Sequence, residues 1–400
     1  MSIKYPVFIS LSPNIQADDI LLSLGLIFCP WKWKKGKAIT KFEKEFKKYI
    51  GTSYVKSYNS GRSAFLSILK ALDFKDGEII VQGFTCNALI NPIIWSGLKP
   101  IYVDIDDTLN INPDLIEQKV NEKTKAIIVQ HTFGSPADLG RIMEICNKHN
   151  IILIEDCAHA LGGEYRGRKL GTFGKVSFFS LGRDKIISSV YGGVAMTDDA
   201  GLANKLEDYN YPSNAWIVQQ LLHPIITKVF VIPLYRILGI GKFLLILLQK
   251  TKVISKAVSK AEKRGQKPVY IPKHMSNALA ILGLKQLKKI HKFNDHRKDI
   301  ADYYDKYFID KKVKNQIYMR YSLITNEKSK DVINRLKKQY IFINDGWNSS
   351  VIVPCDTDQE KMGYVKGVCP KAEDYSNRIV NLPTHINISH KIVDRIVKYF

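Results

Sequence analysis

The alternation of short apolar segments with helical ones constrains the fold of this 400-residue chain more than any other feature. Helical periodicities such as Ser63–Leu72 and Leu139–Lys148 separate apolar segments that have the length of buried strands. These segments are Ile79–Val81, Ile101–Val103, Ala126–Val129, Ile151–Ile154, Val176–Phe179 and Val194–Met196. Continuous apolar strands separated by helices are typical of a largely parallel sheet covered on both faces. The sequence therefore predicts an α/β fold whose ligands bind beyond the carboxyl ends of the strands.

A chain of this length has room for two domains and a connection between them. We expect an N-terminal segment over residues 1–39 and a large α/β domain over residues 40–208. Residues 209–268 break the alternation and are interpreted as an insertion. Residues 269–400 then form a smaller α/β domain, in which Asn277–Phe308 has a helical pattern.

The insertion is apolar in its first part and basic in its second. Trp216–Leu248 is interrupted by proline and charged residues, which argues against a bilayer span of ~20 apolar residues. In Lys250–Lys267, the side chains of Lys252, Lys256 and Lys260 recur every fourth residue, so a helix would align them on one face. The pattern favours a helix pair lying on an anionic membrane surface. The alternative is an insertion packed on its own protein or on a partner subunit.

The charge and the cysteine content indicate which ligands the protein attracts and in which compartment it lies. The chain has 60 Lys and Arg against 38 Asp and Glu, a net charge of +22, which attracts phosphorylated substrates, anionic lipid or nucleic acid. No nucleic-acid-binding motif accompanies this charge, so we expect no nucleic-acid partner. The six cysteines form no CxxC pair, and the apolar stretch at the N-terminus is too short for a signal peptide. We therefore expect reduced thiols and a cytoplasmic protein, peripheral at the inner face of the membrane if the insertion binds lipid.

A lysine follows the end of one predicted strand. The segment Val176–Lys185 reads VSFFSLGRDK, and its strand ends at Ser180, five residues before Lys185. Desolvation of an amine in a cleft favours its neutral form, which is a Schiff-base nucleophile. The alternative is an ordinary surface lysine.

Two carboxylates follow another predicted strand. Asp156 at the tip of IILIED is placed to hold a buried cationic ring nitrogen, because a buried charge is tolerated when it is paired. Glu155, Asp156 and His159 together offer the alternative of a metal site. No second cluster of hard ligands supports that alternative, so we expect no metal.

The segment YNSGRSAFLSILKAL opens a helix at Gly61, Arg62 and Ser63. Free backbone N–H groups and the helix dipole make such an end a phosphate site, and a plain N-cap is the alternative. A phosphate, a protonated ring nitrogen and an aldehyde for Lys185 are together the features of pyridoxal 5′-phosphate (PLP).

The motifs in this order resemble the DegT/DnrJ/StrS aminotransferases, which are PLP enzymes of fold type I. The resemblance rests on FEKEFKKYIG (42–51), NSGRSAFLSILKAL (59–72), GLKPIYVDID (97–106), TKAIIVQHTFGSPADLGRI (124–142), IEDCAHALGGEYRGRKLGTFG (154–174), FFSLGRDK (178–185), HMSNALAILGLKQLKKI (274–290) and CPKAEDYSNRIVNLPTH (369–385). It implies that Lys185 carries the cofactor, that Asp156 pairs with the pyridine nitrogen, and that His159 lies near the phenolic oxygen of the ring. It also implies transfer of an amino group, from glutamate, to a nucleotide-linked keto-sugar for surface polysaccharide or glycan synthesis.

The resemblance further implies that Ser180, with Arg62 and Ser63, holds the phosphate. His274 stands where the family has Arg or Asn reaching the phosphate of the neighbouring subunit, which implies a homodimer with shared active sites. Cys86 replaces the aromatic residue that covers the ring in the family, and Arg62 replaces a threonine.

Two further departures concern the substrate. Val190 and Tyr191 replace a Gly-Glu pair, and the insertion over residues 209–268 is longer and more apolar than the family's connection. A PLP-dependent sugar dehydratase is an alternative, but the resemblance implies that family members of that kind have histidine in place of the lysine at position 185. A non-catalytic scaffold that binds membrane or a partner is a second alternative.

Overall fold

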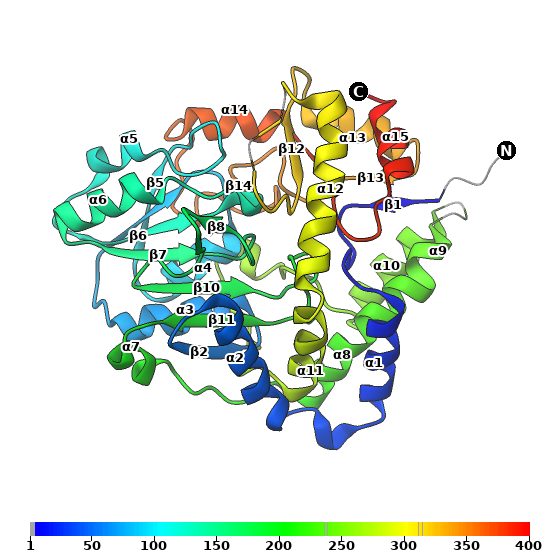
Figure 1. Ribbon diagram of the computed structural model, residues 1–400, viewed down its shortest axis with the longest axis horizontal. Helices are drawn as coiled ribbons and strands as arrows, with labels where there is room; N and C mark the ends of the chain where they lie inside the picture. Colours follow the sequence, from blue (N-terminus) through cyan, green and yellow to red (C-terminus); the bar gives the residue numbers. More distant parts are fainter. Residues whose placement is uncertain (1–4, 236, 238, 311, 314) are drawn as a thin grey trace.

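A seven-stranded sheet forms the centre of the large domain in the computed structural model, which describes all residues except 1–4, 236, 238, 311 and 314 (Figure 1). Its strand order is β2-β11-β10-β7-β6-β3-β5, and only β11 runs antiparallel to its neighbours. The strands are β2 (Tyr54–Tyr58), β3 (Glu78–Gln82), β5 (Lys99–Val103), β6 (Thr124–Gln130), β7 (Ile152–Asp156), β10 (Val176–Ser180) and β11 (Gly193–Thr197). The predicted α/β fold with a mostly parallel sheet is confirmed. All six predicted strands are present, and β2 is an addition to them.

Helices flank this sheet, and its central strands lie in the core. All five positions of β11 are buried, which requires cover on both faces. The surrounding helical elements are α2 (Lys37–Ile50), α3 (Gly61–Leu72), α4 (Asn87–Trp95), α5 (Pro113–Ile116), η2 (Glu117–Lys119), η3 (Thr132–Gly134), α6 (Leu139–His149) and α7 (Ala200–Lys205). The hydroxyl of Ser60 caps α3 by accepting from the Ser63 amide at 3.2 Å, so the N-cap named as the alternative at this helix start is present.

The smaller domain has a hydrophobic core of its own and includes the start of the chain. Val7 and Ile9 are buried in this core, because β1 pairs in parallel with β13. Figure 1 shows β1 beside the C-terminal helix α15. The elements are β1 (Val7–Phe8), α12 (Ile290–Phe308), β12 (Tyr321–Ile324), α13 (Ser329–Lys337), β13 (Ile341–Phe342), α14 (Pro370–Arg378), β15 (Ile379–Leu382) and α15 (His390–Val397). The preceding helix α11 (Asn277–Leu287) packs on α2 and buries its apolar side chains in the main core. The predicted helical stretch Asn277–Phe308 is thus two helices.

A short strand pair joins the two domains beside the carboxyl edge of the main sheet. Strand β14 (Ile352–Val353) runs parallel to β4 (Thr85–Cys86), which immediately precedes α4. Residues of the smaller domain are therefore brought next to the loops that follow β3.

The apolar part of the insertion is helical. Its elements are α8 (Asn214–Ile225), the π-helical turn η4 (Ile226–Val231), α9 (Ile232–Leu234) and α10 (Ile240–Lys250). Helix α8 buries Ile217 and Leu221 in the main core and packs on α1 (Ala17–Ile27), which η1 (Pro30–Lys32) follows. By length and composition Asn214–Leu234 would suffice to cross a bilayer, and 39% of its most apolar window is buried within the protein.

The basic part of the insertion does not form the predicted amphipathic helix. Its only helical element among the described residues is the 3₁₀ turn η5 (Glu262–Arg264), so the alignment expected for Lys252, Lys256 and Lys260 on one helix face was wrong. The backbone carbonyls of residues 255–257 accept hydrogen bonds from distant side chains rather than from amides one turn ahead. Tertiary contacts therefore override the local pattern.

Candidate active site

The three predicted motifs meet at one edge of the main sheet. Strands β7 and β10 are parallel, with Asp156 opposite Phe178, so Asp156 and Ser180 end neighbouring strands on the same side. Strand β2 runs in the same direction and leads into α3, whose first residue is Gly61. A cavity of about 310 Å³ opens at this edge, as expected for the carboxyl ends of parallel strands. The predicted residues that line it are Gly61, Arg62, Cys86, Asp156, His159, Ser180 and Lys185.

Lys185 lies beside a neutral histidine in this cavity. Its Nζ is 2.8 Å from Nε2 of His159, while Nδ1 of His159 accepts from the Phe133 amide at 3.4 Å. Burial, together with the charge of Lys185, holds the pKa of His159 well below its usual value. Phe133 stacks on the His159 ring, with centroids 5.5 Å apart, and Trp347 meets it edge-on at 5.0 Å. The imidazole is therefore fixed in position and uncharged at neutral pH.

Asp156 is a buried carboxyl without a strong cationic partner. Burial raises its pKa to about 6, even though the Ala158 amide donates to it at 2.9 Å and Lys185 contributes a nearby positive charge. A carboxylate in this condition is stabilised by an added cation. The protonated ring nitrogen of PLP is such a cation, so this side of the cavity fits the cofactor.

The cradle between α3 and β10 fits a phosphate group. A Cβ atom at Gly61 would lie 3.2 Å from Cβ of Ser180, so only glycine leaves this space open. The Oγ atom of Ser180 accepts from the Gly182 amide at 3.3 Å. The helix start, the hydroxyl and the glycine loop together offer the donors that anions bind at helix N-termini.

Arg62, although it lines the cavity, directs its guanidinium away from this cradle, toward the buried carboxylate of Glu262. Ser63 is fully buried and donates its hydroxyl to Asn59 at 2.6 Å, so it lies behind the cavity wall. Each side chain therefore has a polar partner within the protein, Glu262 for Arg62 and Asn59 for Ser63. The phosphate contacts that the resemblance implies for these two residues stay predictions.

Cys86 and His274 differ in their placement. Cys86 borders the cavity, and its sulfur caps α4 by accepting from the Ala88 amide at 3.4 Å. Burial raises the pKa of this thiol, so it is a neutral surface beside the ring position. His274 binds Asp208 at 2.9 Å and stacks on Tyr211, and among the described residues it is not part of the cavity lining.

The alternative metal site from Glu155, Asp156 and His159 does not form. Successive residues of a strand point to opposite faces, so Glu155 lies on the far side of β7 from Asp156. Its oxygens accept from the amides of Gly171, Phe173 and Gly174 at 2.7 to 2.8 Å. The one group with metal-ligand spacing in the described chain is His131, Glu155 and Cys157. In this group the oxygens of Glu155 already accept from the three amides, so we interpret the group as a structural hydrogen-bond network.

Several site residues escaped the sequence interpretation because they come from the far end of the chain. Arg320 is almost fully buried and lies 3.2 Å from Asp345 and 3.9 Å from Asp184, the neighbour of Lys185. Burial by itself would raise the pKa of Asp184, but the charges of Lys185 and Arg320 lower it. Trp347 reaches His159 from the same loop as Asp345. Nothing local marks Arg320 or Trp347, since Asp184 and His159, their neighbours in the site, are more than a hundred positions away.

The fold and this cavity define an enzyme that binds PLP. The DegT/DnrJ/EryC1/StrS aminotransferase family model matches residues 29–225 and 247–400, and leaves the apolar segment 226–246 unmatched. The GDP-perosamine synthase of Escherichia coli O157:H7 is 29% identical over 374 residues, which cover 91% of this chain and 89% of that protein.

Solved structures have the same fold. The PseC aminotransferase of Helicobacter pylori, involved in the biosynthesis of pseudoaminic acid, superposes with a TM-score of 0.73 at 22% identity and covers 98% of each chain. The NtdA protein of Bacillus subtilis with bound cofactor PMP has a TM-score of 0.74 at 21% identity, covering 100% of this chain and 85% of its own. The chain therefore belongs to the DegT/DnrJ/EryC1/StrS aminotransferase family and is a PLP-dependent aminotransferase.

Proposed function

We propose that this aminotransferase moves an amino group from glutamate to a nucleotide-linked keto-sugar for surface polysaccharide or glycan synthesis. The observation that carries the proposal is the meeting of Lys185, Asp156 and the Ser180 cradle in one cavity. The substrate class is supported by relatives, among them the E. coli GDP-perosamine synthase and a spore coat polysaccharide biosynthesis protein of Bacillus subtilis. The basic surface suits a nucleoside diphosphate.

Three polar residues of the cavity, Lys185, Asp156 and His159, have roles in this reaction. When bound, PLP supplies an aldehyde that takes up the donor amine and a ring that accepts electrons from its α-carbon. The Lys185 amine removes the proton from the donor Cα and delivers a proton to the acceptor carbon in the reverse half reaction. The Asp156 carboxylate holds the proton on the ring nitrogen. Neutral His159, fixed by Phe133, orients Lys185 at 2.8 Å without competing for its proton.

The visible absorption spectrum of the protein with added PLP tests the first half reaction. We expect a lysine-dependent band in the wild type that glutamate bleaches, and no such band in Lys185→Ala. A band that glutamate leaves unchanged would contradict glutamate as the donor. Incubation of the amine form with nucleotide-linked keto-sugars then tests the acceptor by mass spectrometry.

We also propose a homodimer with shared active sites, in the cytoplasm. Support comes from His274, which lies outside the cavity of its own chain, and from an apolar surface on α1 and η1. This surface, called the α1 patch, consists of Leu21, Leu24, Phe28 and Trp31, all exposed. A second copy of the chain is the occupant that would cover it. Light scattering should give twice the monomer mass for the wild type and the monomer mass for Phe28→Ser/Trp31→Ser; a monomeric wild type would contradict the proposal.

A second apolar surface supports peripheral binding to an anionic membrane. The α10 patch consists of Val229, Phe230, Ile237, Ile240, Phe243, Ile246 and Leu247, all exposed. Most of it lies in residues 226–246, the segment that the family model leaves unmatched. Lys242, Lys250 and Lys252 are exposed beside it, a combination that suits an interface with anionic headgroups.

Sedimentation with vesicles tests whether the α10 patch, and not the α1 patch, binds lipid. Wild-type protein should pellet with vesicles containing phosphatidylglycerol at low salt, and less with pure phosphatidylcholine. Phe243→Ser/Leu247→Ser should abolish pelleting, whereas the α1-patch variant serves as the matched control and should still bind. Absence of binding by the wild type would refute membrane association.

A further inference from the structure

A segment of the insertion forms part of the wall of the active-site cavity. Residues Ser255–Gly265, called the strap, contribute Ala257, Val258 and Lys263 to the lining of the cavity that holds Lys185. The strap has bends and a turn but no strand or helix before the 3₁₀ turn Glu262–Arg264. Its position therefore sets the shape of the space beside the lysine.

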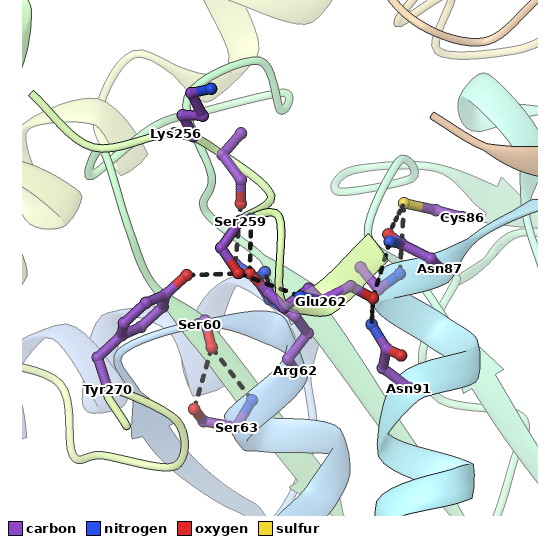
Figure 2. A network of polar contacts seen from close by, with 12 residues as sticks. Ser60, Arg62, Ser63, Cys86, Asn87, Asn91, Lys256, Ser259, Glu262 and Tyr270 are labelled. Atoms are coloured by element: carbon purple, nitrogen blue, oxygen red, sulfur yellow. Dashed lines mark hydrogen bonds and ion pairs between the residues drawn. The ribbon is translucent and has the colours of Figure 1, made fainter. Parts of the chain in front are cut away.

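Glu262 anchors the strap from within the protein. The side chain is completely buried, and Figure 2 shows Arg62 and Tyr270 pointing toward it. Arg62 pairs with one carboxylate oxygen, while the Tyr270 hydroxyl at 2.9 Å and the Ser259 amide at 2.8 Å donate to the other. The backbone carbonyl of Glu262 also accepts from Asn91 of α4 at 2.9 Å. A buried carboxylate with this many donors has a single stable position.

The first part of the strap is held by three cavity residues. Arg62 donates to the Ala257 carbonyl at 3.2 Å, and the Tyr191 hydroxyl donates to the Lys256 carbonyl at 2.6 Å. Arg183 donates to the carbonyl and hydroxyl of Ser255.

Lys263 is the cationic side chain that the strap adds to the cavity. Its Nζ lies 2.6 Å from both oxygens of Asp356, whose side chain is 64% exposed. A phosphate bears more charge than this exposed carboxylate and competes well for the ammonium group. Lys260, three residues earlier on the strap, is exposed and is not part of the cavity lining.

We propose that the strap is a fixed wall of the acceptor site, that the Arg62–Glu262 pair holds it there, and that Lys263 on this wall binds a phosphate of the acceptor. Glu262 is then a positioning residue, and Lys263 determines specificity for a phosphorylated acceptor. The inference rests on the proposed function for the identity of the acceptor. The role of the Arg62–Glu262 pair, called the latch, in holding the strap does not depend on the identity of the acceptor.

Limited trypsin digestion of the full chain tests whether this pair holds the strap, because the strap contains the cleavage sites Lys256, Lys260, Lys263 and Arg264. Cleavage follows the population of the opened segment. Glu262→Gln leaves Arg62 buried without its counter-charge, so we expect strap cleavage to be faster by about tenfold or more. Arg62→Thr should have the same effect.

A double variant and a surface control variant show whether an effect on cleavage comes from the Arg62–Glu262 pair. The double variant Arg62→Thr/Glu262→Gln should be cleaved no faster than the faster single variant, because the two residues act as one pair. Glu360→Gln, a change at an exposed carboxylate, should match the wild type. Wild-type cleavage rates in the single variants, or cleavage spread over the whole chain rather than the strap, would overturn the latch.

The nucleoside diphosphates UDP and GDP test the phosphate contact. We expect at least one of them to slow strap cleavage several-fold in the wild type and in Lys260→Gln, and neither to do so in Lys263→Gln. Equal protection in Lys263→Gln, or none in the wild type, would overturn the assignment of Lys263. The glutamate-dependent bleaching of the PLP band is measured on the same variants. If glutamate does not bleach the band in the wild type, the proposed function is contradicted. If glutamate bleaches the band but neither UDP nor GDP slows strap cleavage, only the present inference is contradicted.

Discussion

Replacement of Asp156 by asparagine should make the cofactor-free protein more stable at pH 8. Burial raises the pKa of Asp156 to about 6, against 3.8 for an exposed aspartate. The folded state thus binds this proton more tightly than the unfolded state does, so stability is fully present below pH ~4 and falls as the pH rises through about 6. The difference corresponds to about 3 kcal/mol of destabilisation when the group is ionised. Asparagine keeps the acceptor for the Ala158 amide and has no charge to bury.

Urea denaturation of cofactor-free protein at pH 5 and pH 8 measures this effect. The free energy of unfolding of Asp156→Asn should exceed that of the wild type by up to about 3 kcal/mol at pH 8 and by less at pH 5. The two free energies should become equal near pH 4. With PLP present the order should reverse, because asparagine gives the ring nitrogen no counter-charge.

Asp184→Asn is the matched control for this prediction. The charges of Lys185 and Arg320 overcome the effect of burial and lower the pKa of Asp184, so its ionised form stabilises the folded protein. That stability is present above the unfolded pKa and is lost as the pH falls, so Asp184→Asn should destabilise most at pH 8. The reasoning would be refuted if Asp156→Asn were less stable than the wild type at pH 8, or if its effect were the same at both pH values.

Three further predictions concern the surroundings of the site. Gly193→Ala should abolish the PLP band and lower the unfolding temperature, because the added Cβ would lie 2.2 Å from the Ser60 backbone at the start of α3; an unchanged band measured by absorbance would contradict the close packing. Arg320→Leu should cost about 3 to 5 kcal/mol in urea denaturation at pH 7, since it leaves Asp345 buried without its partner, and a loss below 1 kcal/mol would show that the pair contributes little. Cys355 is the one cysteine of the six that is classed as exposed, so a thiol reagent should modify it first. Cys355→Ser should remove the fast phase of the reaction.

Much of the fold could be predicted from local sequence patterns. Apolar runs such as Ala126–Val129 and Val176–Phe179 are buried on both faces of the sheet, so their composition alone identifies them as strands. Strand β2 was missed because Tyr54–Tyr58 is half-exposed and polar at its start. The helical pattern of Asn277–Phe308 was correct in type, but its break between α11 and α12 carries no proline or glycine to mark it.

The candidate site was predictable where each residue belongs to a strand end. Lys185, Asp156 and Ser180 lie in the cavity because the carboxyl ends of parallel strands meet at one edge. The basic segment was predicted wrongly as a helix, since the periodicity of Lys252 and Lys256 was the only local signal and the carbonyls there bind Tyr191 and Arg62 instead.

The sequence by itself determined the mostly parallel α/β fold and that Lys185, Asp156 and Ser180 lie at one edge of the sheet, because strand burial and strand-end position depend on short stretches of residues. The tertiary structure alone decided which side chains surround those residues. Arg62 pairs with Glu262 across 200 positions, and Trp347 reaches His159 from the other domain. Such contacts depend on where folded segments come to lie in space, and the energy of a buried charge or ring is set by those neighbours rather than by the residues beside it in the chain.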